Sequence, residues 1–445
     1  MQFTLDRQTL ADLAVAGSGT QQSLTSLFKP DTLGGQTMLI QLFNHPLADM
    51  ELLWNRSAAI AYLHVNEFEI KFDKDELDFI EHYLRQGQSP DSVSKVRAVK
   101  NDLLNKISPS NHYYVVKRGV GLLVKLLNYM DNFFQSIHSQ HRPSLFVDFA
   151  LCTNVLLDAG DGIIISGLKN KRYLNAMDLE RCDYLFRRKA HQQVKAFLDV
   201  VYEVDVYNAV ACTAVSRGFS YPVIVDQDGP VLELEDLFHP FVQRPVTNNI
   251  SFAKHNLCFV TGANMAGKST LLKSIGVAVL LAHIGFPVPA SAMKTSLFKG
   301  LFTTINLSDN INLGHSHFYA EVLRVKEIAQ HINDLESIVV IFDELFRGTN
   351  VKDAYDASLA IIKALAQVKK CIFIVSTHII EVAEQLQETN GVFFKCFSTS
   401  LKGNKAFYNY KLGDGVNTER LGMKIIEDEN ILAMLQASAY NIEHS

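Results

Sequence analysis

Residues 257–270 read Leu-Cys-Phe-Val-Thr-Gly-Ala-Asn-Met-Ala-Gly-Lys-Ser-Thr. A short apolar run is followed by a loop with glycine at positions 262 and 267. The loop fits the pattern G-x-x-x-x-G-K-[ST] at every fixed position. The apolar run before it predicts a buried strand, and residues 270–281 predict a helix, which is the context that this pattern requires. The sequence therefore predicts a phosphate-binding loop made by Gly262, Ala263, Asn264, Met265, Ala266, Gly267, Lys268, Ser269 and Thr270.

In a loop of this kind, backbone N–H groups curve around phosphate oxygens, and the helix that follows adds partial positive charge. We expect Lys268 to reach the β- and γ-phosphates of a nucleotide and the Ser269 hydroxyl to ligate Mg²⁺. ATP and Mg²⁺ are therefore the predicted cofactors.

Two further apolar runs end in polar residues. Residues 338–342 are apolar and lead into Asp343 and Glu344. Because ligands of open α/β sheets bind at the carboxyl ends of the strands, we expect Asp343 to hold Mg²⁺ and Glu344 to orient and deprotonate an attacking water. Residues 371–375 predict a third strand, which would place His378 near a γ-phosphate.

The first half of the sequence has helical texture. Apolar residues from Val116 to Ile137, and again from Phe197 to Val215, recur in steps of four and three, which predicts two long helices with a buried seam. After Gly218 the texture changes to short apolar strands that alternate with helices. We predict an α plus α/β fold: residues 1–217 form a helical domain, and residues 218–445 form an ABC-type P-loop ATPase domain with a mainly parallel sheet.

Composition excludes several classes of protein. The 445 residues are 48% hydrophobic, which suits packed cores, and 42 Lys and Arg face 47 Asp and Glu, for a net charge of −5. This balance excludes a protein that coats nucleic acid by bulk charge, but not one with a local basic patch. The six cysteines are scattered, without the spacing of a zinc ribbon or a disulfide framework, and no signal peptide or membrane span is visible. We expect a soluble cytoplasmic protein.

Several motifs together resemble the MutS family of DNA mismatch-repair ATPases. They are TGANMAGKST at 261–270, LLAHIGFPVPA at 280–290, DNINLGHSHFYAE at 309–321, FDELFRGTN at 342–350 and STH at 376–378. Residues 202–240 and 23–56 add weaker similarity to the family's lever and core. The resemblance implies an ATPase that dimerises through its ATPase domains and couples ATP hydrolysis to the binding of double-stranded DNA.

The resemblance also implies roles for single residues. Ser316 would reach the γ-phosphate of the partner subunit's nucleotide, and residues 348–350 would belong to a communicating loop. The sequence departs from the family at five positions: Ala263 replaces a usual Pro, Ala266 and Phe346 replace common glycines, His317 replaces Thr, and Val246 occupies the place of an aromatic that stacks on adenine.

The substrate stays open at this stage. We expect the sequence to lack the family's mismatch-recognition and connector domains and to have a reduced or absent clamp. A homodimer that acts in mismatch repair is one reading, and a binder of branched or recombination-intermediate DNA is the alternative. A transporter subunit is disfavoured because residues 330–337 (QHINDLES) offer no LSGGQ-like signature.

A candidate DNA contact lies between residues 168 and 195. It consists of the basic residues Lys169, Lys171, Arg172, Arg187, Arg188 and Lys189, interleaved with Tyr173, Tyr184 and Phe186. Such a patch binds backbone phosphates and stacks bases without sequence specificity. Acidic residues within the stretch weaken the patch, and a solvated helix surface is an equal alternative.

Overall fold

The computed structural model describes residues 3–17, 22–66, 68, 70–86, 92–108, 110–137, 142–158, 174–227, 229–252, 254–305, 317–346, 348–377, 379–402, 405–417, 431 and 434. These residues form two compact units. One contains residues 1–24, 45–53 and 216–445 and is called the α/β unit; the other contains residues 25–44 and 54–215 and is called the helical unit.

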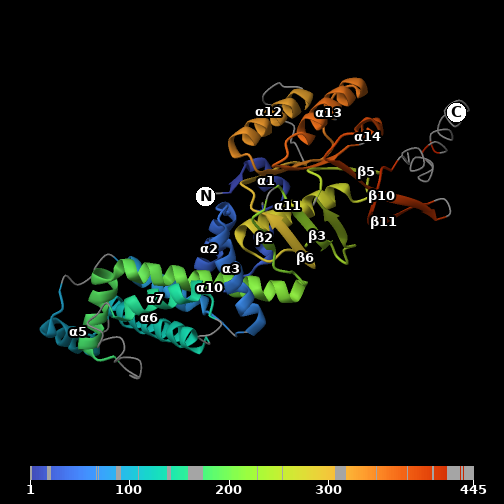
Figure 1. The fold of residues 1–445 in the computed structure, drawn as a ribbon. Helices are drawn as coiled ribbons and strands as arrows, with labels where there is room; N and C mark the ends of the chain where they lie inside the picture. Colours follow the sequence, from blue (N-terminus) through green and yellow to red (C-terminus); the bar gives the residue numbers. More distant parts are fainter. Residues whose placement is uncertain are drawn as a thin grey trace, which may run out of the picture. The chain divides into compact units, whose positions relative to one another are not determined.

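The α/β unit is built on a seven-stranded sheet with the order β1-β7-β8-β9-β5-β10-β11 (Figure 1). The strands are β1 (Thr4–Leu5), β5 (Leu257–Gly262), β7 (Gly300–Thr304), β8 (Ile338–Phe342), β9 (Ile372–Ser376), β10 (Val392–Lys402) and β11 (Lys405–Asp414). All neighbouring pairs are parallel except β10 and β11. The predicted strands at 257–260 and 338–342 and the mainly parallel sheet are confirmed, and the third predicted strand is displaced by one residue.

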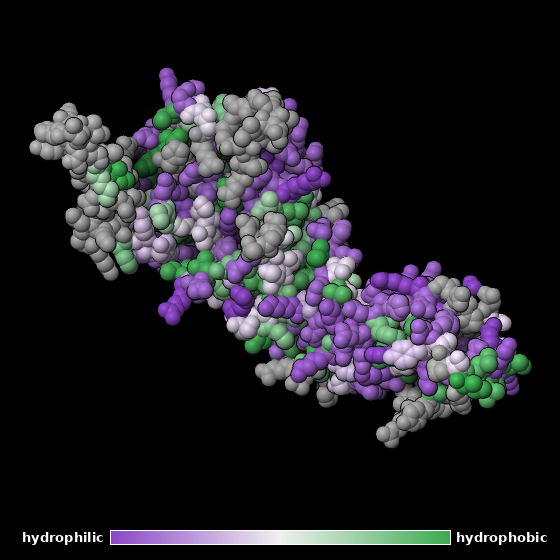
Figure 2. Space-filling model, turned by 180° about the vertical axis from the view of Figure 1, so that it is seen from behind, coloured by the Kyte–Doolittle hydropathy of each residue, from purple (hydrophilic) through white to green (hydrophobic). Residues whose placement is uncertain are grey.

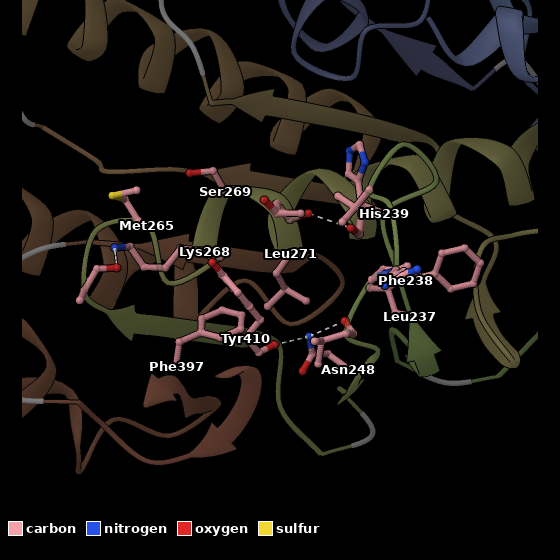
Figure 3. A pocket seen from close by; sticks show the side chains of 18 of the residues that line it. Leu237, Phe238, His239, Asn248, Met265, Lys268, Ser269, Leu271, Phe397 and Tyr410 are labelled. Carbon is pink, nitrogen blue, oxygen red and sulfur yellow. Dashed lines mark hydrogen bonds between the residues drawn. The ribbon is translucent and has the colours of Figure 1, made fainter. Parts of the chain in front are cut away.

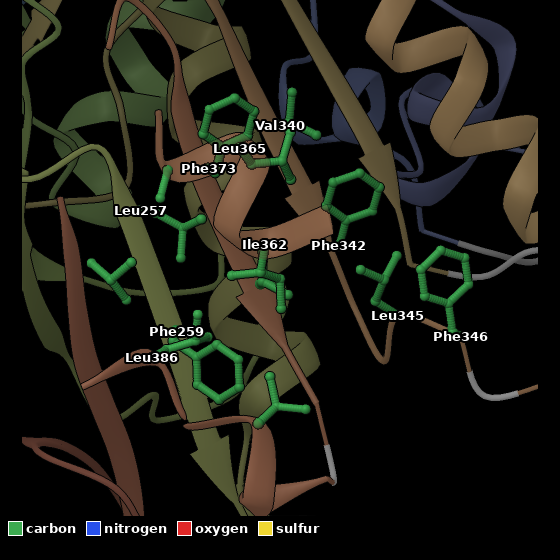
Figure 4. Packing of buried hydrophobic residues seen from close by; sticks show 14 of the residues in the cluster. Leu257, Phe259, Val340, Phe342, Leu345, Phe346, Ile362, Leu365, Phe373 and Leu386 are labelled. Carbon is green, nitrogen blue, oxygen red and sulfur yellow. The ribbon is translucent and has the colours of Figure 1, made fainter. Parts of the chain in front are cut away.

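Helices cover both faces of this sheet (Figure 1). On one face α12 (His317–Leu335), α13 (Val351–Ala366) and α14 (Ile380–Leu386) enclose a hydrophobic core that includes Phe259, Val340 and Phe342 (Figure 4). On the other face lie α1 (Arg7–Asp12) and α11 (Lys268–Ile284), where Gly276 leaves room for the side chains of Leu13 and Ile341. Alternate residues of each buried strand thus serve opposite layers.

A second, four-stranded sheet has the order β2-β6-β3-β4. Its strands are β2 (Val223–Val225), β3 (Leu232–Leu237), β4 (Asn248–Ser251) and β6 (Ala292–Ser296). Strand β4 continues into the segment that leads to β5, so this sheet places residues 237–248 next to the loop that follows β5.

The helical unit contains long helices with buried seams. It is formed by η1 (Leu24–Leu27), α2 (Leu33–Asn44), α3 (Met50–Asn66), α4 (Lys74–Arg85), α5 (Lys95–Ile107), α6 (Asn111–Ser136), α7 (Ser144–Asp158), α9 (Ala176–Tyr184), the π-helical turn η3 (Leu185–Lys189) and α10 (His191–Arg217). Leu24 of η1, residues 50–53 of α3 and residues 216–217 of α10 belong to the α/β unit. The seam predicted from Val116 is buried along α6. The second seam is buried in α10 at Phe197, Val201, Val204 and Ala211, Asn208 within it is half-buried, and Val215 is 55% exposed, so the prediction is wrong at Val215.

The surface of the helical unit is uneven in character. Hydrophobic residues gather at the end of this unit where α5 lies (Figure 2). They include Val96, Val99, Leu103 and Ile107, all strongly exposed, whereas Ala98 is buried. Helix α5 therefore contributes little to the core of the described part of the unit.

The division of the chain after Val215 lies close to the predicted boundary at residue 217. The observed division differs from the prediction for residues 1–24 and 45–53, which belong to the α/β unit. The physical reason is backbone hydrogen bonding: β1 pairs in parallel with β7, and Leu47 N–H donates to the His283 carbonyl at 2.7 Å. A strand of two residues has no periodicity that a sequence pattern could reveal.

No helix among the described residues is long and apolar enough to cross a membrane.

Candidate functional site

The loop 262–269 connects the carboxyl end of β5 to the first turn of α11. Gly262 has φ of +150° and Gly267 has φ of +107°, backbone conformations that favour glycine. A Cβ at Gly262 would lie 3.1 Å from Cβ of Phe397, so a side chain there would also be crowded. The loop thus turns tightly and brings the free N–H groups of the α11 N-terminus to its concave side.

Lys268 is the first residue of α11 and is 5% exposed. Its Nζ donates to the carbonyl oxygens of Gly262 at 2.7 Å and Ala263 at 3.3 Å, across its own loop. Burial lowers the pKa of the Lys268 ammonium, while the nearby charges of Glu344 and Asp343 act in the opposite direction. The amine is therefore held inside the loop by neutral acceptors.

A cavity of about 580 Å³ opens beside this loop (Figure 3). The cavity is lined by residues of the loop and of α11, by Glu344, by the segment 237–248 of the second sheet, and by the β10–β11 hairpin. Its lining residues are Leu237, Phe238, His239, Val242, Gln243, Arg244, Pro245, Val246, Asn248, Ala263, Asn264, Met265, Gly267, Lys268, Ser269, Thr270, Leu271, Ser274, Glu344, Phe397 and Tyr410. The size suits a drug-sized or nucleotide-sized ligand.

The wall opposite the loop carries aromatic and polar side chains. Asn248 Nδ2 donates to the Tyr410 carbonyl at 3.1 Å and ties β4 to the hairpin, as Figure 3 shows. Burial, and then the charge of Lys273, lowers the pKa of His239, which favours a neutral imidazole. Val246, where the resemblance implies an aromatic residue, also lines the cavity and is 42% exposed.

The carboxylates Asp343 and Glu344 follow β8 directly and are both half-buried. Asp343 N–H donates to the Thr304 carbonyl at 2.9 Å, and Glu344 N–H donates to the carbonyl and hydroxyl oxygens of Ser376, each at 3.1 Å. The Ser376 hydroxyl donates to Asp343 Oδ1. The ends of β7 and β9 therefore fix the backbone of both acidic residues.

In the segment that follows β8, both Glu344 and Phe346 have left-handed backbone conformations. Glu344 has φ of +58° and Phe346 has φ of +60°, where a non-glycine residue is strained. The resemblance implies a glycine at the position of Phe346, and glycine adopts a positive φ without strain. The ring of Phe346 is buried, with its centroid 5.6 Å from that of Phe318, so packing holds the residue in this conformation.

The structure brings most of the predicted nucleotide residues together. Ala263, Asn264, Met265, Gly267, Lys268, Ser269, Thr270 and Glu344 line one cavity. Gly262 and Ala266 shape the loop without lining the cavity, and Asp343 lies beside Glu344 at a smaller hollow. His378 and Ser316 lie outside the described residues.

The donor set near the loop is compatible with Mg²⁺. The Ser269 hydroxyl and the carboxylates of Asp343 and Glu344 are hard oxygen ligands, and Mg²⁺ in nucleotide sites is bound by one or two such groups together with phosphate oxygens and water. Within the described ranges, no cluster of three or more His, Cys, Asp or Glu residues could hold a metal ion by itself.

Sequence analysis did not single out the cavity wall formed by His239, Asn248, Phe397 and Tyr410. Only His239 carried a signal, within the segment that resembles the family's entry to the ATPase domain. The other three come from strands β4, β10 and β11, and their approach to the loop depends on the pairing of β10 with β5.

The predicted DNA-binding patch is partly wrong. Arg187 is 7% exposed and forms a bidentate ion pair with Asp183, with Nε and Nη2 at 2.6 and 2.5 Å from the two carboxylate oxygens. Tyr83 donates to Asp183 Oδ1 at 2.8 Å, so Arg187 belongs to a buried network and not to a phosphate-binding surface.

Phe186 is also fully buried and cannot stack on a base. Arg188 and Lys189 are exposed. Lys169, Lys171, Arg172 and Tyr173 lie outside the described residues.

Comparison with known proteins places this site in a family. The family model for MutS domain V matches residues 258–444. DNA mismatch repair protein MutS of Wolbachia pipientis is 28% identical over 300 residues, 64% of this chain and 33% of the relative. MutS of Thermus thermophilus is 35% identical over 202 residues, 44% of this chain and 24% of the relative.

A relative from Drosophila melanogaster, DNA mismatch repair protein spellchecker 1, is 31% identical over 225 residues, 49% of this chain and 24% of the relative. The chain therefore spans from about a quarter to a third of the length of these relatives. The domain V match covers the loop 262–269, β8 with its two carboxylates, and the β10–β11 hairpin, so the part of the chain that holds the candidate site matches the domain V family of MutS proteins.

Proposed function

We propose that this chain hydrolyses ATP to ADP and phosphate as a P-loop ATPase and couples hydrolysis to DNA binding in mismatch repair. One observation carries the proposal. Lys268, at the start of α11, and Glu344, after β8, line the same cavity although they come from separate strand–loop segments. Both residue types at these strand ends suit phosphoryl transfer to water.

Each residue has a proposed role. The loop N–H groups and Lys268 bind the phosphates and stabilise the charge that spreads over the γ-phosphoryl oxygens. Glu344 orients the attacking water and accepts its proton. Ser269 and Asp343 hold Mg²⁺, which when bound neutralises charge on the β- and γ-phosphates. By resemblance, His378 senses the γ-phosphate, and Ser316 reaches the site of the partner subunit in a homodimer.

Glu344→Gln tests the chemistry. The amide keeps the size of the side chain but cannot accept a proton at neutral pH, so we expect ATP turnover to fall about 10²-fold or more while ATP still binds. Glu336→Gln, an exposed site before β8, is the matched control and should leave turnover unchanged. Wild-type-like turnover in Glu344→Gln would remove this residue from the mechanism.

A panel of DNA substrates tests the biological role. Electrophoretic binding to mismatched, perfect and branched duplexes, with and without ATP, should show preference for the mismatch. A preference for branched DNA over both others would instead support a binder of recombination intermediates.

Sedimentation velocity tests the dimer. We expect the nucleotide-bound Glu344→Gln protein to sediment as a dimer. A monomer under every nucleotide condition would remove the role given to Ser316.

A further inference from the structure

A buried polar cluster surrounds the carboxyl end of β7, outside the nucleotide cavity. Thr9 Oγ1 accepts a hydrogen bond from Thr303 N–H at 2.9 Å. Asp12 Oδ2 accepts from the Thr303 hydroxyl at 2.7 Å and from Ile305 N–H at 2.9 Å. Thr9, Asp12 and Thr303 are all buried, so water does not compete for these bonds. Helix α1 thus holds residues that follow it by almost three hundred positions.

Helix α12 holds the same strand end through Arg324. Its Nη2 donates to the Thr303 carbonyl at 2.8 Å, and its Nε donates to Thr304 Oγ1 at 3.3 Å. The guanidinium also pairs with Asp6, the N-cap of α1, at 2.5 Å and with Glu327 at 2.8 Å. Because Arg324 contacts both α1 and β7, it joins the two into one network.

The network continues to the acidic residues of the candidate site. Thr304 lies opposite Phe342 in the parallel register of β7 and β8, and the Thr304 carbonyl accepts the N–H of Asp343 at 2.9 Å. Since Asp343 and Glu344 come directly after Phe342, the position of Thr304 sets where their backbone begins. Helix α12 adds a second hold, because Glu321 accepts from Gly348 N–H at 3.3 Å.

It is unusual for α1 and β7 to be joined by buried polar side chains. Buried polar groups cost free energy unless they are hydrogen-bonded, and apolar side chains could join α1 to β7 more simply. The hydrogen bonds instead converge on three consecutive residues, Thr303 to Ile305, at the point where the sheet delivers its carboxylates. Directional bonds fix the position of a strand end more sharply than apolar contacts do.

We propose that Thr9 and Asp12, with Arg324, are positioning residues of the ATPase site: they set the end of β7 and thereby place Asp343 and Glu344. This inference rests on the proposed function for its effect on catalysis. None of the three lines the cavity beside the phosphate-binding loop, and they act through Thr303, Thr304 and the Asp343 backbone.

Thr9→Val is the informative variant because it keeps the shape of the side chain and removes only the acceptor for Thr303 N–H. Thr9→Ser restores the hydroxyl and serves as the conservative rescue. Asn256→Ala is the matched destabilised control: Asn256 is a buried polar residue of the same unit, which donates to the Val368 carbonyl at the opposite end of the sheet.

The first measurement is amide hydrogen exchange of the peptide that contains residues 343–346, on nucleotide-free protein. We expect exchange about tenfold faster in Thr9→Val than in wild type, return to the wild-type rate in Thr9→Ser, and no change in Asn256→Ala. Unchanged exchange in Thr9→Val would overturn the inference. This readout needs no ATP hydrolysis, so it decides the inference even if the protein proves not to be an ATPase.

The second measurement separates kcat from nucleotide affinity. Thr9→Val should lower kcat about tenfold and change the Kd for ATP less than twofold, because the phosphate-binding loop is untouched. A kcat loss no greater than that of Asn256→Ala would overturn the inference. If Thr9→Val does not fold, Arg324→Lys takes its place, because it removes the guanidinium hydrogen bonds from α12 to Thr303 and Thr304. The same faster exchange at residues 343–346 and the same loss of kcat are then expected, and their absence would overturn the inference.

Discussion

Lys268 and Arg187 are both buried cations at positions where the sequence suggested contact with phosphate, and their surroundings differ. Among the described residues, the hydrogen-bond acceptors of Lys268 are carbonyl oxygens of its own loop, on the wall of a cavity. Arg187 is neutralised by Asp183 inside the helical unit and has its guanidinium carbon 5.2 Å from the ring centroid of Tyr83. A buried cation without a carboxylate partner can serve a ligand, whereas one with a bidentate partner serves the fold.

The largest expected effect is on stability in the helical unit. Arg187→Ala leaves Asp183 buried without its counter-charge, so the free energy of unfolding should fall by about 3–5 kcal/mol. Chemical denaturation followed by circular dichroism measures this. The exposed neighbour Arg188 is the control, and Arg188→Ala should change stability by less than about 0.5 kcal/mol. Equal effects of the two variants would contradict the structural role of Arg187.

Lys268→Ala should give the opposite result. ATP turnover should fall about 10²–10³-fold, because a cation that stabilises the transferred phosphoryl group is lost. Stability should change little, because the Lys268 partners among the described residues are neutral carbonyl oxygens and the substitution leaves no buried counter-charge in that set. Lys363→Ala, at an exposed site on α13, is the control for the turnover assay. If Lys268→Ala lowered the free energy of unfolding as much as Arg187→Ala does, Lys268 would serve the fold as Arg187 does, and the two cations would not differ in role.

His283 is a third buried base, and its pKa is set mainly by burial, against the opposing hydrogen bond to the Val279 carbonyl. Its Nδ1 pairs with the Val279 carbonyl at 2.8 Å and its Nε2 accepts from Phe298 N–H at 3.0 Å, an arrangement that fits the neutral ring. Burial lowers the pKa of His283 from its ordinary 6.5 to about 4. Between these pH values the unfolded chain binds the proton and the folded chain does not, so stability is lost as the pH falls.

The expected loss between pH 6.5 and pH 4 is about 3 kcal/mol from this residue. Denaturation at several pH values, in wild type and in His283→Gln, isolates it, because other titrating groups are common to both proteins. The same pH dependence in the two proteins would show that His283 is charged when folded.

The smallest expected effect concerns Arg188 and Lys189, the exposed remainder of the predicted patch among the described residues. If both contact DNA phosphates, Arg188→Ala with Lys189→Ala should lower the slope of log K against log salt by about 1–2. The exposed Lys326 of α12 is the control. An unchanged slope would locate DNA binding elsewhere.

The sequence predicts the local parts of the site well. Loop 262–269, the strands on which it and Asp343 depend, and the seam of α6 are patterns of neighbouring residues, and the structure has them at those positions. The burial of Arg187 is not predictable in this way, because its network includes Tyr83, about a hundred residues away. The cavity wall at Tyr410 and the pairing of β1 with β7 are likewise long-range, and no local periodicity encodes them.

The pairing of β1 with β7 has a consequence for how the protein is made. A ribosome adding 5–20 residues per second completes β7 roughly 15–60 s after β1, so the early strand must wait for its neighbour. Until then β1 lacks the strand with which it pairs in the finished sheet. An unpaired strand can form hydrogen bonds with a strand of another chain, which leads to aggregation. A fragment that begins at Ser216 would carry the same defect permanently, because β7 would become an open edge. The edge of the large sheet at β7 is therefore covered by β1, the strand farthest from β7 in the sequence of the α/β unit. We expect correct folding of this unit to depend on protection of β1 during synthesis.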